Sequence, residues 1–226
     1  MQKALNHHFF KTWFPEMAWA LGYFAADGSM IRNKRNGCYI EITTTDKVLL
    51  ENIRTITESQ NRICVRQNRN SNWKKQYRIQ IASTIWFDDL TKLGFTQSKS
   101  KTLSFPKVPN AFLGDFVRGY FDGDGCVYFG HLQFSDRKKK RWILQTLFTS
   151  GSHSFLGSLW SVLKKQGIRG GSLVRKKSGF ELKFSHKDSV ELYRFMYHNA
   201  GTKSLYLPRK RKMLEKAIKT LGYLRP

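Results

Sequence analysis

The chain has 226 residues, with 40 lysines and arginines against 16 aspartates and glutamates, a formal net charge of +24. A surplus of one sign on this scale indicates a polyanionic partner, nucleic acid ahead of an anionic membrane surface. No apolar run approaches the ~18 residues of a membrane span, and residues 1–11 contain no signal-peptide core, so we expect an intracellular protein, whether cytoplasmic, nucleoid or organellar.

The three cysteines argue against a disulfide framework and against a zinc site. Cys38, Cys64 and Cys126 are odd in number and widely spaced, and the histidines do not accompany them at ligand spacing. Neither a disulfide-rich fold nor a zinc finger is therefore indicated.

The first strong pattern is a helix that ends in an acid. Pro15 suits the first position of a helix, and the pattern predicts a helix over residues 15–26, followed by Asp27 and a glycine, Gly28, interpreted as its C-terminal stop. Small residues recur in it at four-residue spacing: Ala18, Gly22 and Ala26. Residues four apart share one helix face, and a mid-helix glycine costs ~1 kcal/mol relative to alanine. The flat stripe therefore predicts close packing against another helix.

The remainder of the first half predicts a hairpin, further strands and two helices. Asn36-Gly37 is a hairpin signal, and Asp46 is the expected N-cap of a helix that continues to about residue 59. Strands are expected at residues 39–43, 63–69 and 76–82, where polar and apolar residues alternate. A short helix near residues 85–93 and a linker around Pro106 follow.

The acid-ending helix then occurs a second time. The sequence GYFDGDG at residues 119–125 repeats GYFAADG at residues 22–28. If the two helices pack in parallel, Asp27 and Asp124 arrive at the same end. Two carboxylates there are disfavoured by the helix dipoles and by each other unless a cation lies between them. Oxygen ligands supplied by few protein groups suit Mg²⁺.

The second half repeats the order of elements of the first. Strands are expected near residues 126–134, 142–149, 173–176 and 180–184, with helices after Ser152 and around residues 190–196. The segment KSLYLP at residues 203–208 echoes KTLSFP at residues 101–106. Each half therefore follows the pattern αββαββα, an α+β fold.

The repeated motif resembles that of the LAGLIDADG homing endonuclease family in its single-chain, two-motif form. The second copy is the closer match, whereas Ala25 replaces the usual acid in the first. The resemblance implies two pseudo-symmetric halves, residues 1–106 and 107–226, whose antiparallel sheets form a DNA-binding saddle around the central helix pair. It also implies a monomer, because the single chain contains its own pseudo-twofold axis.

The same resemblance implies an activity and its residues. The expected reaction is a staggered double-strand cut in a long DNA target by metal-dependent phosphodiester hydrolysis, with two or three Mg²⁺ ions. Asp27 and Asp124 would be the catalytic metal ligands, each with the preceding carbonyl, of Ala26 or Gly123. The repeated lysines, Lys101 and Lys203, match the family's basic residue near the active site. Gly22 and Gly119, with Ala18, would form the helix-pair interface.

Polar residues on the open sheet faces and in the loops are the expected DNA contacts. Arginine and lysine read guanine and glutamine reads adenine in the major groove, whereas loop cations suit phosphates. The predicted set is Arg32, Lys34, Arg35, Arg66, Arg78 and Gln80 in the first half, and Lys139, Arg141, Gln145, Arg175, Glu181 and Lys183 in the second.

Two alternative functions remain open at this stage. An RNA-splicing maturase and a non-cutting DNA-binding protein could use the same fold, although an acid in both motifs favours the nuclease. The chain begins with neither Cys nor Ser and ends in Leu224-Arg225-Pro226, and these ends do not match intein splice junctions. We therefore expect an intron-encoded or free-standing protein.

Overall fold

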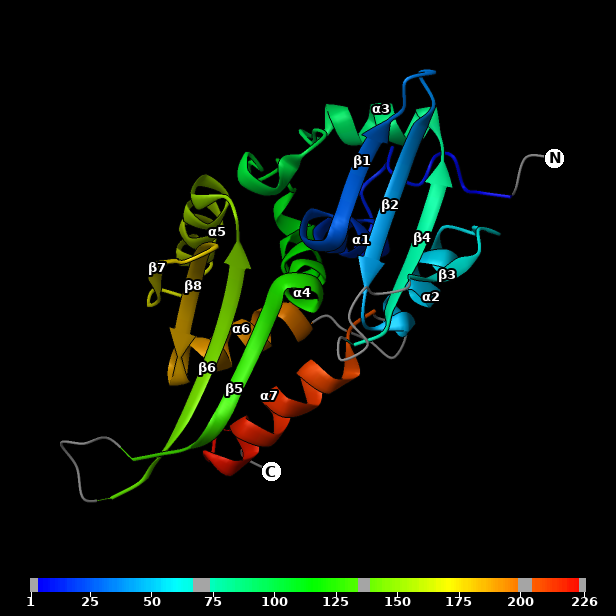
Figure 1. Cartoon of the computed structure of the whole chain (residues 1–226). Coiled ribbons are helices and arrows are strands. Elements are labelled where there is room, and N and C mark those ends of the chain that lie inside the picture. The colour runs from blue at the N-terminus through cyan, green and yellow to red at the C-terminus, as the bar shows by residue number, and fades with distance from the viewer. Residues whose placement is uncertain (1–3, 67–73, 134–138, 199–204, 224–226) are drawn as a thin grey trace.

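The computed structural model of the chain describes residues 4–66, 74–133, 139–198 and 205–223 (Figure 1). The first half contains α1 (Pro15–Asp27), β1 (Gly28–Arg32), β2 (Cys38–Thr44), α2 (Lys47–Ile56), β3 (Ile63–Arg66), β4 (Gln76–Ala82) and α3 (Thr84–Lys92). Two short 3₁₀ turns, η1 (Lys99–Lys101) and η2 (Asn110–Phe112), connect it to the second half. The second half contains α4 (Leu113–Asp124), β5 (Gly125–Leu132), β6 (Arg141–Ser150), α5 (His153–Lys165), β7 (Ser172–Lys176), β8 (Gly179–Ser185), α6 (His186–Tyr197) and α7 (Pro208–Thr220).

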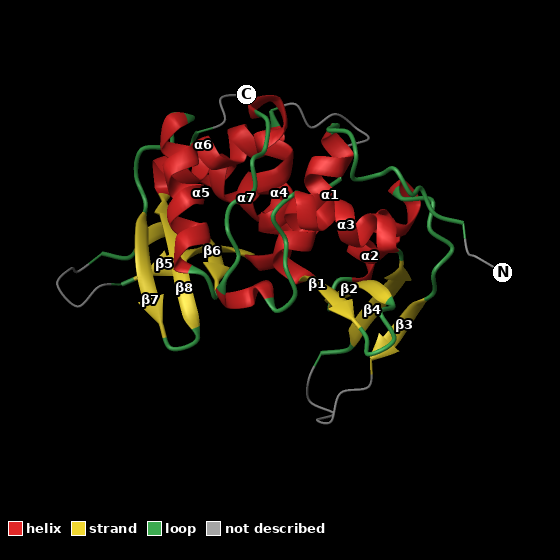
Figure 2. Ribbon diagram, turned by 90° about the horizontal axis from the view of Figure 1, so that it is seen from above, coloured by secondary structure: helices red, strands yellow, loops and turns green. Residues whose placement is uncertain are grey.

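Two antiparallel four-stranded sheets confirm the predicted α+β repeat. Their strand orders are β1-β2-β4-β3 and β5-β6-β8-β7, so the two halves have the same topology. The α-helices gather on one side of the sheets, and the sheets diverge on either side of the helix pair (Figure 2). Each sheet consequently keeps one face away from the helices, as the alternation of polar and apolar residues predicts.

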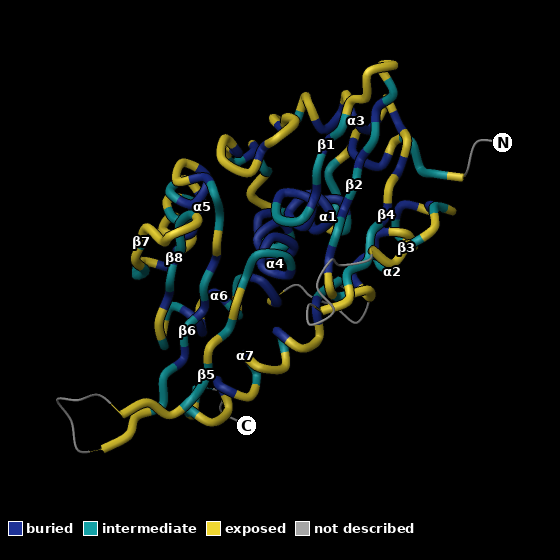
Figure 3. The backbone as a smooth tube through the Cα atoms, in the orientation of Figure 1, coloured by how far each residue is buried: buried dark blue, intermediate teal, exposed yellow. Residues whose placement is uncertain are grey.

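The centre of the molecule is the pair of motif helices, α1 and α4, which are buried over most of their length (Figure 3). A side chain at Gly22 would overlap the backbone carbonyl of Phe116, and one at Gly119 would overlap that of Trp19. The contacts advance in the same direction along both helices, reaching Ala26 and Gly123 at their ends. The helices therefore pack in parallel, backbone against backbone, as the stripe of small residues predicts.

The glycine that ends each motif has a different role from the predicted one. Gly28 and Gly125 have φ values of −86° and −91°, so neither is a left-handed helix stop. They are the first residues of β1 and β5, and a side chain there would overlap the ring of Phe24 or Phe121. Each motif helix thus runs directly into the inner strand of its sheet.

Two further features differ from the sequence prediction. Asp46 makes no side-chain cap to α2; its carboxylate instead accepts two bonds from Arg209, at 3.0 and 2.7 Å. Arg209 belongs to α7, a helix that the sequence reading did not identify, and its contact with Asp46 links the second half to the first.

The connector between the halves packs on both. Leu103 accepts a bond from Ser152 at 2.7 Å, and the ring of Phe105 lies against Phe116 and Phe155. The division after residue 106 stays a prediction, and it falls within a segment already in contact with the second half. None of the helices in the described part of the chain is long and apolar enough to cross a membrane.

Candidate active site and DNA-binding face

The two motif aspartates meet at the ends of the paired helices. The site of a Cβ on Gly123 lies 3.5 Å from the Oδ2 of Asp27, so the acid of the first helix reaches across to the second. Burial, and then the charge of Asp124, raise the pKa of Asp27 to about 7. Burial also raises the pKa of Asp124. Two adjacent carboxyl groups whose ionisation is disfavoured by burial form a site that a cation would stabilise.

A buried lysine lies beside the end of each motif helix. The Nζ of Lys99 donates to the carbonyl of Ala25 at 2.7 Å. The Nζ of Lys210 donates to the carbonyls of Phe121, Asp122 and Gly123, at 2.7, 2.8 and 3.0 Å. Each ammonium therefore caps the negative end of a helix dipole.

The two lysines are structural equivalents. Their ammonium groups lie 5.6 Å from the ring of Phe24 and 5.4 Å from that of Phe121, the matching phenylalanines of the two motifs. Burial lowers the pKa of Lys99 to about 8 and that of Lys210 to about 8, while the nearby carboxylates oppose that shift. An ammonium of lowered pKa beside two acids can donate or accept a proton nearer to neutral pH than an ordinary lysine.

These lysines are not the ones that the sequence predicted. Lys101 is exposed, and Lys99, two residues earlier, is the lysine of that segment that contacts the motif helix. Lys203 lies outside the described residues, and the second half supplies Lys210 from α7. One signal was available in the sequence: a lysine two residues after Pro208, near the positive end of a helix dipole, is unfavourable unless the site needs it.

A third acid of the motif is buried away from the helix ends. Asp122 is 1% exposed and accepts a bond from the indole of Trp19 at 2.8 Å, across the helix pair. Burial raises its pKa to about 6. Because Ala25 occupies the matching position of the first motif, this contact has no counterpart there, and Asp122 joins the two helices to each other.

The register of the strands decides which predicted contacts lie on the open faces. In the first sheet Arg66, Arg78 and Gln80 alternate with the core residues of β3 and β4, as predicted. In the second sheet the open face carries Arg141, Gln145, Glu181 and Lys183. Lys34, Arg35 and Lys139 are exposed next to strands. Their contact with DNA stays a prediction.

Two predicted contacts lie on the wrong face. Arg32 pairs with the buried Cys38, and its guanidinium lies 5.0 Å from the ring of Phe87, on the helix side of the sheet. Arg175 pairs with Phe180, a residue packed against the core. The alternation in these short edge strands is ambiguous because their ends are exposed on both faces.

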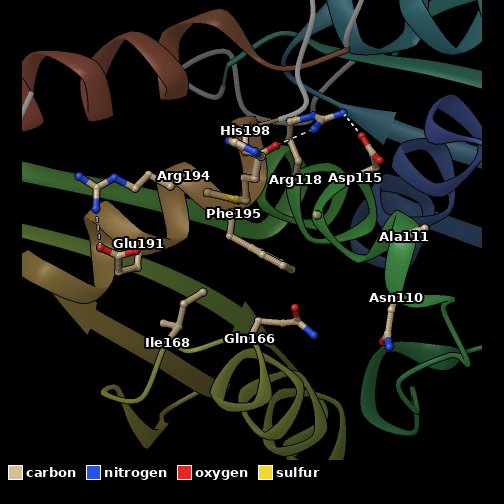
Figure 4. Close-up of a pocket in the computed structure, with 12 residues that line it drawn as sticks. Asn110, Ala111, Asp115, Arg118, Gln166, Ile168, Glu191, Arg194, Phe195 and His198 are labelled. Atoms are coloured by element: carbon tan, nitrogen blue, oxygen red, sulfur yellow. Dashed lines mark hydrogen bonds and ion pairs between the residues drawn. The ribbon is translucent and has the colours of Figure 1, made fainter.

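A pocket in the second half contains none of the predicted site residues. It lies between the start of α4, the end of α5 and the last turns of α6 (Figure 4). Arg118 forms part of its wall and is already bonded to Asp115, at 2.5 Å, and to two backbone carbonyls. The acids of the motif helices and the two lysines beside them lie elsewhere, so we do not assign the chemistry to this pocket.

The sequence of the first half matches a known family directly. A model described as a LAGLIDADG-like domain matches residues 15–92. Among curated proteins, the chain is 29% identical over 123 residues to reverse gyrase of Methanocaldococcus jannaschii and 25% identical over 113 residues to DNA-directed RNA polymerase subunit Rpo1C of the same organism. The aligned segments span 7% and 13% of those proteins.

Solved structures match nearly the whole chain. The LAGLIDADG meganuclease I-AabMI, bound to uncleaved DNA, has a TM-score of 0.63 at 14% identity, covering 93% of this chain and 91% of that one. I-SmaMI, bound to an uncleaved DNA target in the presence of calcium ions, has a TM-score of 0.62 at 15% identity, covering 95% of each chain. The first half therefore matches a LAGLIDADG-like domain in sequence, and the two halves together share the fold of single-chain LAGLIDADG meganucleases.

Proposed function

We propose that the chain is a site-specific homing endonuclease that makes a staggered double-strand cut in a long DNA target. The observation that carries this proposal is the meeting of Asp27 and Asp124 at the ends of the paired helices, between two open sheet faces. The net charge of +24 supports a DNA partner.

The donor set fits a divalent metal, for which we propose Mg²⁺. The described residues contain no group of three or more His, Cys, Asp and Glu side chains that could enclose a metal. The side-chain ligands available at the helix ends are the two carboxylates with raised pKa values. Mg²⁺ commonly binds one or two carboxylates and completes its coordination shell with water and phosphate. Asp27 and Asp124 would hold the ions, together with the carbonyl of Ala26 or Gly123. When bound, such ions activate water and neutralise charge on the phosphate.

The protein's own groups supply positioning and proton transfer in this proposal. Lys210 already bonds the carbonyl of Gly123, so it fixes one proposed ligand, and Lys99 fixes the last turn of the other helix. Their ammonium groups also favour ionisation of the acids, since they lower the carboxyl pKa values that burial raises. We therefore assign the catalytic lysine role to Lys99 and Lys210 in place of Lys101 and Lys203.

A cleavage selection tests the proposal. Purified protein is incubated with Mg²⁺ and a plasmid library of random duplex inserts, and linearised plasmids are sequenced at their ends. We expect one consensus site with a constant stagger. Asp27→Asn and Asp124→Asn should each abolish linearisation and spare binding, because the amide keeps the shape and loses the charge that holds the metal. Full linearisation by the double variant would refute the proposal.

A further inference from the structure

The two halves differ at a matched position next to the motif aspartates. Across β1 and β2, Ser29 pairs with Glu41; across β5 and β6, Cys126 pairs with Leu147. In each sheet this is the second residue pair between the two strands, directly after the pair formed by the glycine that begins the strand. The two pairs are therefore equivalent under the pseudo-twofold axis. A carboxylate in the first half is therefore replaced by a branched alkyl side chain in the second.

In the first half the carboxylate belongs to a polar cluster. Gln80 donates to Glu41 at 3.1 Å, and Arg78 lies 3.5 Å from the same oxygen. The carboxylate thus holds an amide and a guanidinium together on the open face. Such groups recognise hydrogen-bonding base edges in the major groove.

In the second half large apolar side chains alternate with polar ones on the open face. The register assigns five to this face: Tyr128, Leu132, Ile143, Leu147 and Val174. Tyr128, Leu132 and Val174 are 39%, 38% and 41% exposed. On β6 the face reads Arg141, Ile143, Gln145, Leu147, opposite to the face that carries the buried Leu144 and Phe148. Apolar side chains that lie between cationic side chains suit a ligand with anionic groups along its two edges and apolar groups between those edges.

Duplex DNA offers one apolar group in its major groove, the C5-methyl of thymine, which alkyl side chains contact. Leu147 and Ile143 are four residues apart, about 14 Å along a strand at ~3.4 Å per residue. Successive base pairs are also about 3.4 Å apart. The two side chains therefore match methyl groups about four base pairs apart.

We propose that the second sheet recognises thymine methyl groups in its half of the target, through Leu147 near the cut and Ile143 about four base pairs farther out. At the position that mirrors Leu147, the first sheet reads a hydrogen-bonding edge through Glu41, Arg78 and Gln80. The target is consequently asymmetric, with thymines in one half. This inference rests on the proposed sequence-specific binding of DNA.

Replacement of thymine by deoxyuridine tests it, because that change removes only the methyl group. A binding selection from random duplexes, in Ca²⁺, first gives the consensus, and Arg78→Ala marks the half read by the first sheet. Affinity is then measured with deoxyuridine at thymines of the other half. We expect a loss of about fourfold for each of two methyls, the value of one buried methyl group. Leu147→Ala and Ile143→Ala should each remove the loss at one position.

Leu147→Glu is the matched control, since it copies the first half. It should abolish the thymine preference near the cut and leave the preference set by Ile143. If the protein selects a consensus but deoxyuridine has no effect, or acts only in the half marked by Arg78→Ala, the inference is wrong and the proposed function stands. If no consensus emerges, both fail. Loss of a concentration-dependent dimer in Ile143→Asp, with unchanged DNA preference, would assign the apolar face to self-association and overturn the inference.

Discussion

At the scale of single residues, the candidate active site holds charges in surroundings that disfavour them. Asp27 and Asp124 are acids with raised pKa values, and Lys99 and Lys210 are bases with lowered ones. Burial is the largest cause in all four. In the absence of metal these groups oppose folding in their charged forms, and this opposition has a definite pH dependence.

The metal-free protein should have a local minimum of stability near pH 7–8. The pKa of Asp27 rises from 3.8 to about 7 on folding, so between these values the native state holds a proton that the unfolded state has lost. Stability from this group therefore falls as pH rises from 4 to 7. The lysine pKa values fall from 10.5 to about 8, so stability from them rises between pH 8 and 10.5.

Urea denaturation in EDTA across this pH range measures the effect. Asp27→Asn should reduce the fall in the free energy of unfolding between pH 4 and 7. The difference between this variant and the wild type isolates the contribution of Asp27 from that of the other acids. Mg²⁺ should stabilise the wild type more above pH 7 than at pH 5, since Asp27 is ionised only above its raised pKa of about 7 and ligand binding to the native state adds stability by mass action. A wild-type curve parallel to that of Asp27→Asn would contradict the assignment.

Lysine variants separate the capping role from the sequence prediction. Lys210→Met removes the lysine donor from three backbone carbonyls, of which that of Phe121 keeps the bond from the amide of Gly125, whereas Lys99→Met removes it from one. A buried group that loses its partner costs ~1–3 kcal/mol, so Lys210→Met should destabilise more. Both should slow cleavage while the exposed Lys101→Met retains wild-type stability and rate. Cleavage lost in Lys101→Met and kept in Lys99→Met would restore the original prediction.

At the scale of elements, the motif helix pair depends on the absence of side chains at its crossing. Gly119→Ala should be destabilising because its methyl would overlap the carbonyl of Trp19, which is main chain and cannot rotate away. Overpacking costs ~1–3 kcal/mol, which lowers the melting temperature of a chain of this size by roughly 3–10 °C.

Gly157 provides the matched control for this substitution. It lies inside α5 and a Cβ there would meet nothing within 4 Å. Alanine at this position should stabilise by ~0.5–1 kcal/mol, since it reduces the freedom of the unfolded chain. Differential scanning calorimetry of the two variants should therefore show shifts of opposite sign, and a rise for Gly119→Ala would disprove the close crossing.

The sequence predicted the helix pair, the two sheets and the two acids, because each has a local signature. Spacing of small residues encodes the crossing, and two-residue alternation encodes β4 and β8. The lysines were not predictable by repeat matching, since Lys99 precedes Pro106 and Lys210 follows Pro208; the two come from non-equivalent segments that converge only in three dimensions. The face of Arg32 was not predictable because its strand is short and its contact with Phe87 on the helix side joins residues distant in sequence.

At the scale of the whole molecule, the basic surplus predicts binding that is steeply dependent on salt. Each phosphate contact contributes about −0.9 to the slope of log K against log salt concentration. Six contacts or more would reduce affinity about 10³-fold or more between 50 and 200 mM salt. Fluorescence anisotropy with target and unrelated duplexes measures this, and a slope near zero would exclude the saddle as an electrostatic surface.

Two variants distinguish positioning from reading on that surface. Lys139→Ala, next to β6, should weaken binding to all sequences alike and lower the salt slope by about one. Arg78→Ala should relax preference at particular base pairs. If both variants lowered affinity uniformly across sequences, the open face of the first sheet would not read bases.

The contact between Arg209 and Asp46 has a consequence for exchanging halves between proteins of this architecture. Arg209 precedes Lys210, so the turn that anchors α7 to the first half also delivers the lysine to the second motif. The first half carries its lysine in its own connector and needs no such anchor. A chimera that keeps this second half therefore has to receive a first half with an acid where Asp46 stands. A chimera that keeps the first half should place its junction after Lys99, so that the first half retains the lysine that bonds to its own motif helix.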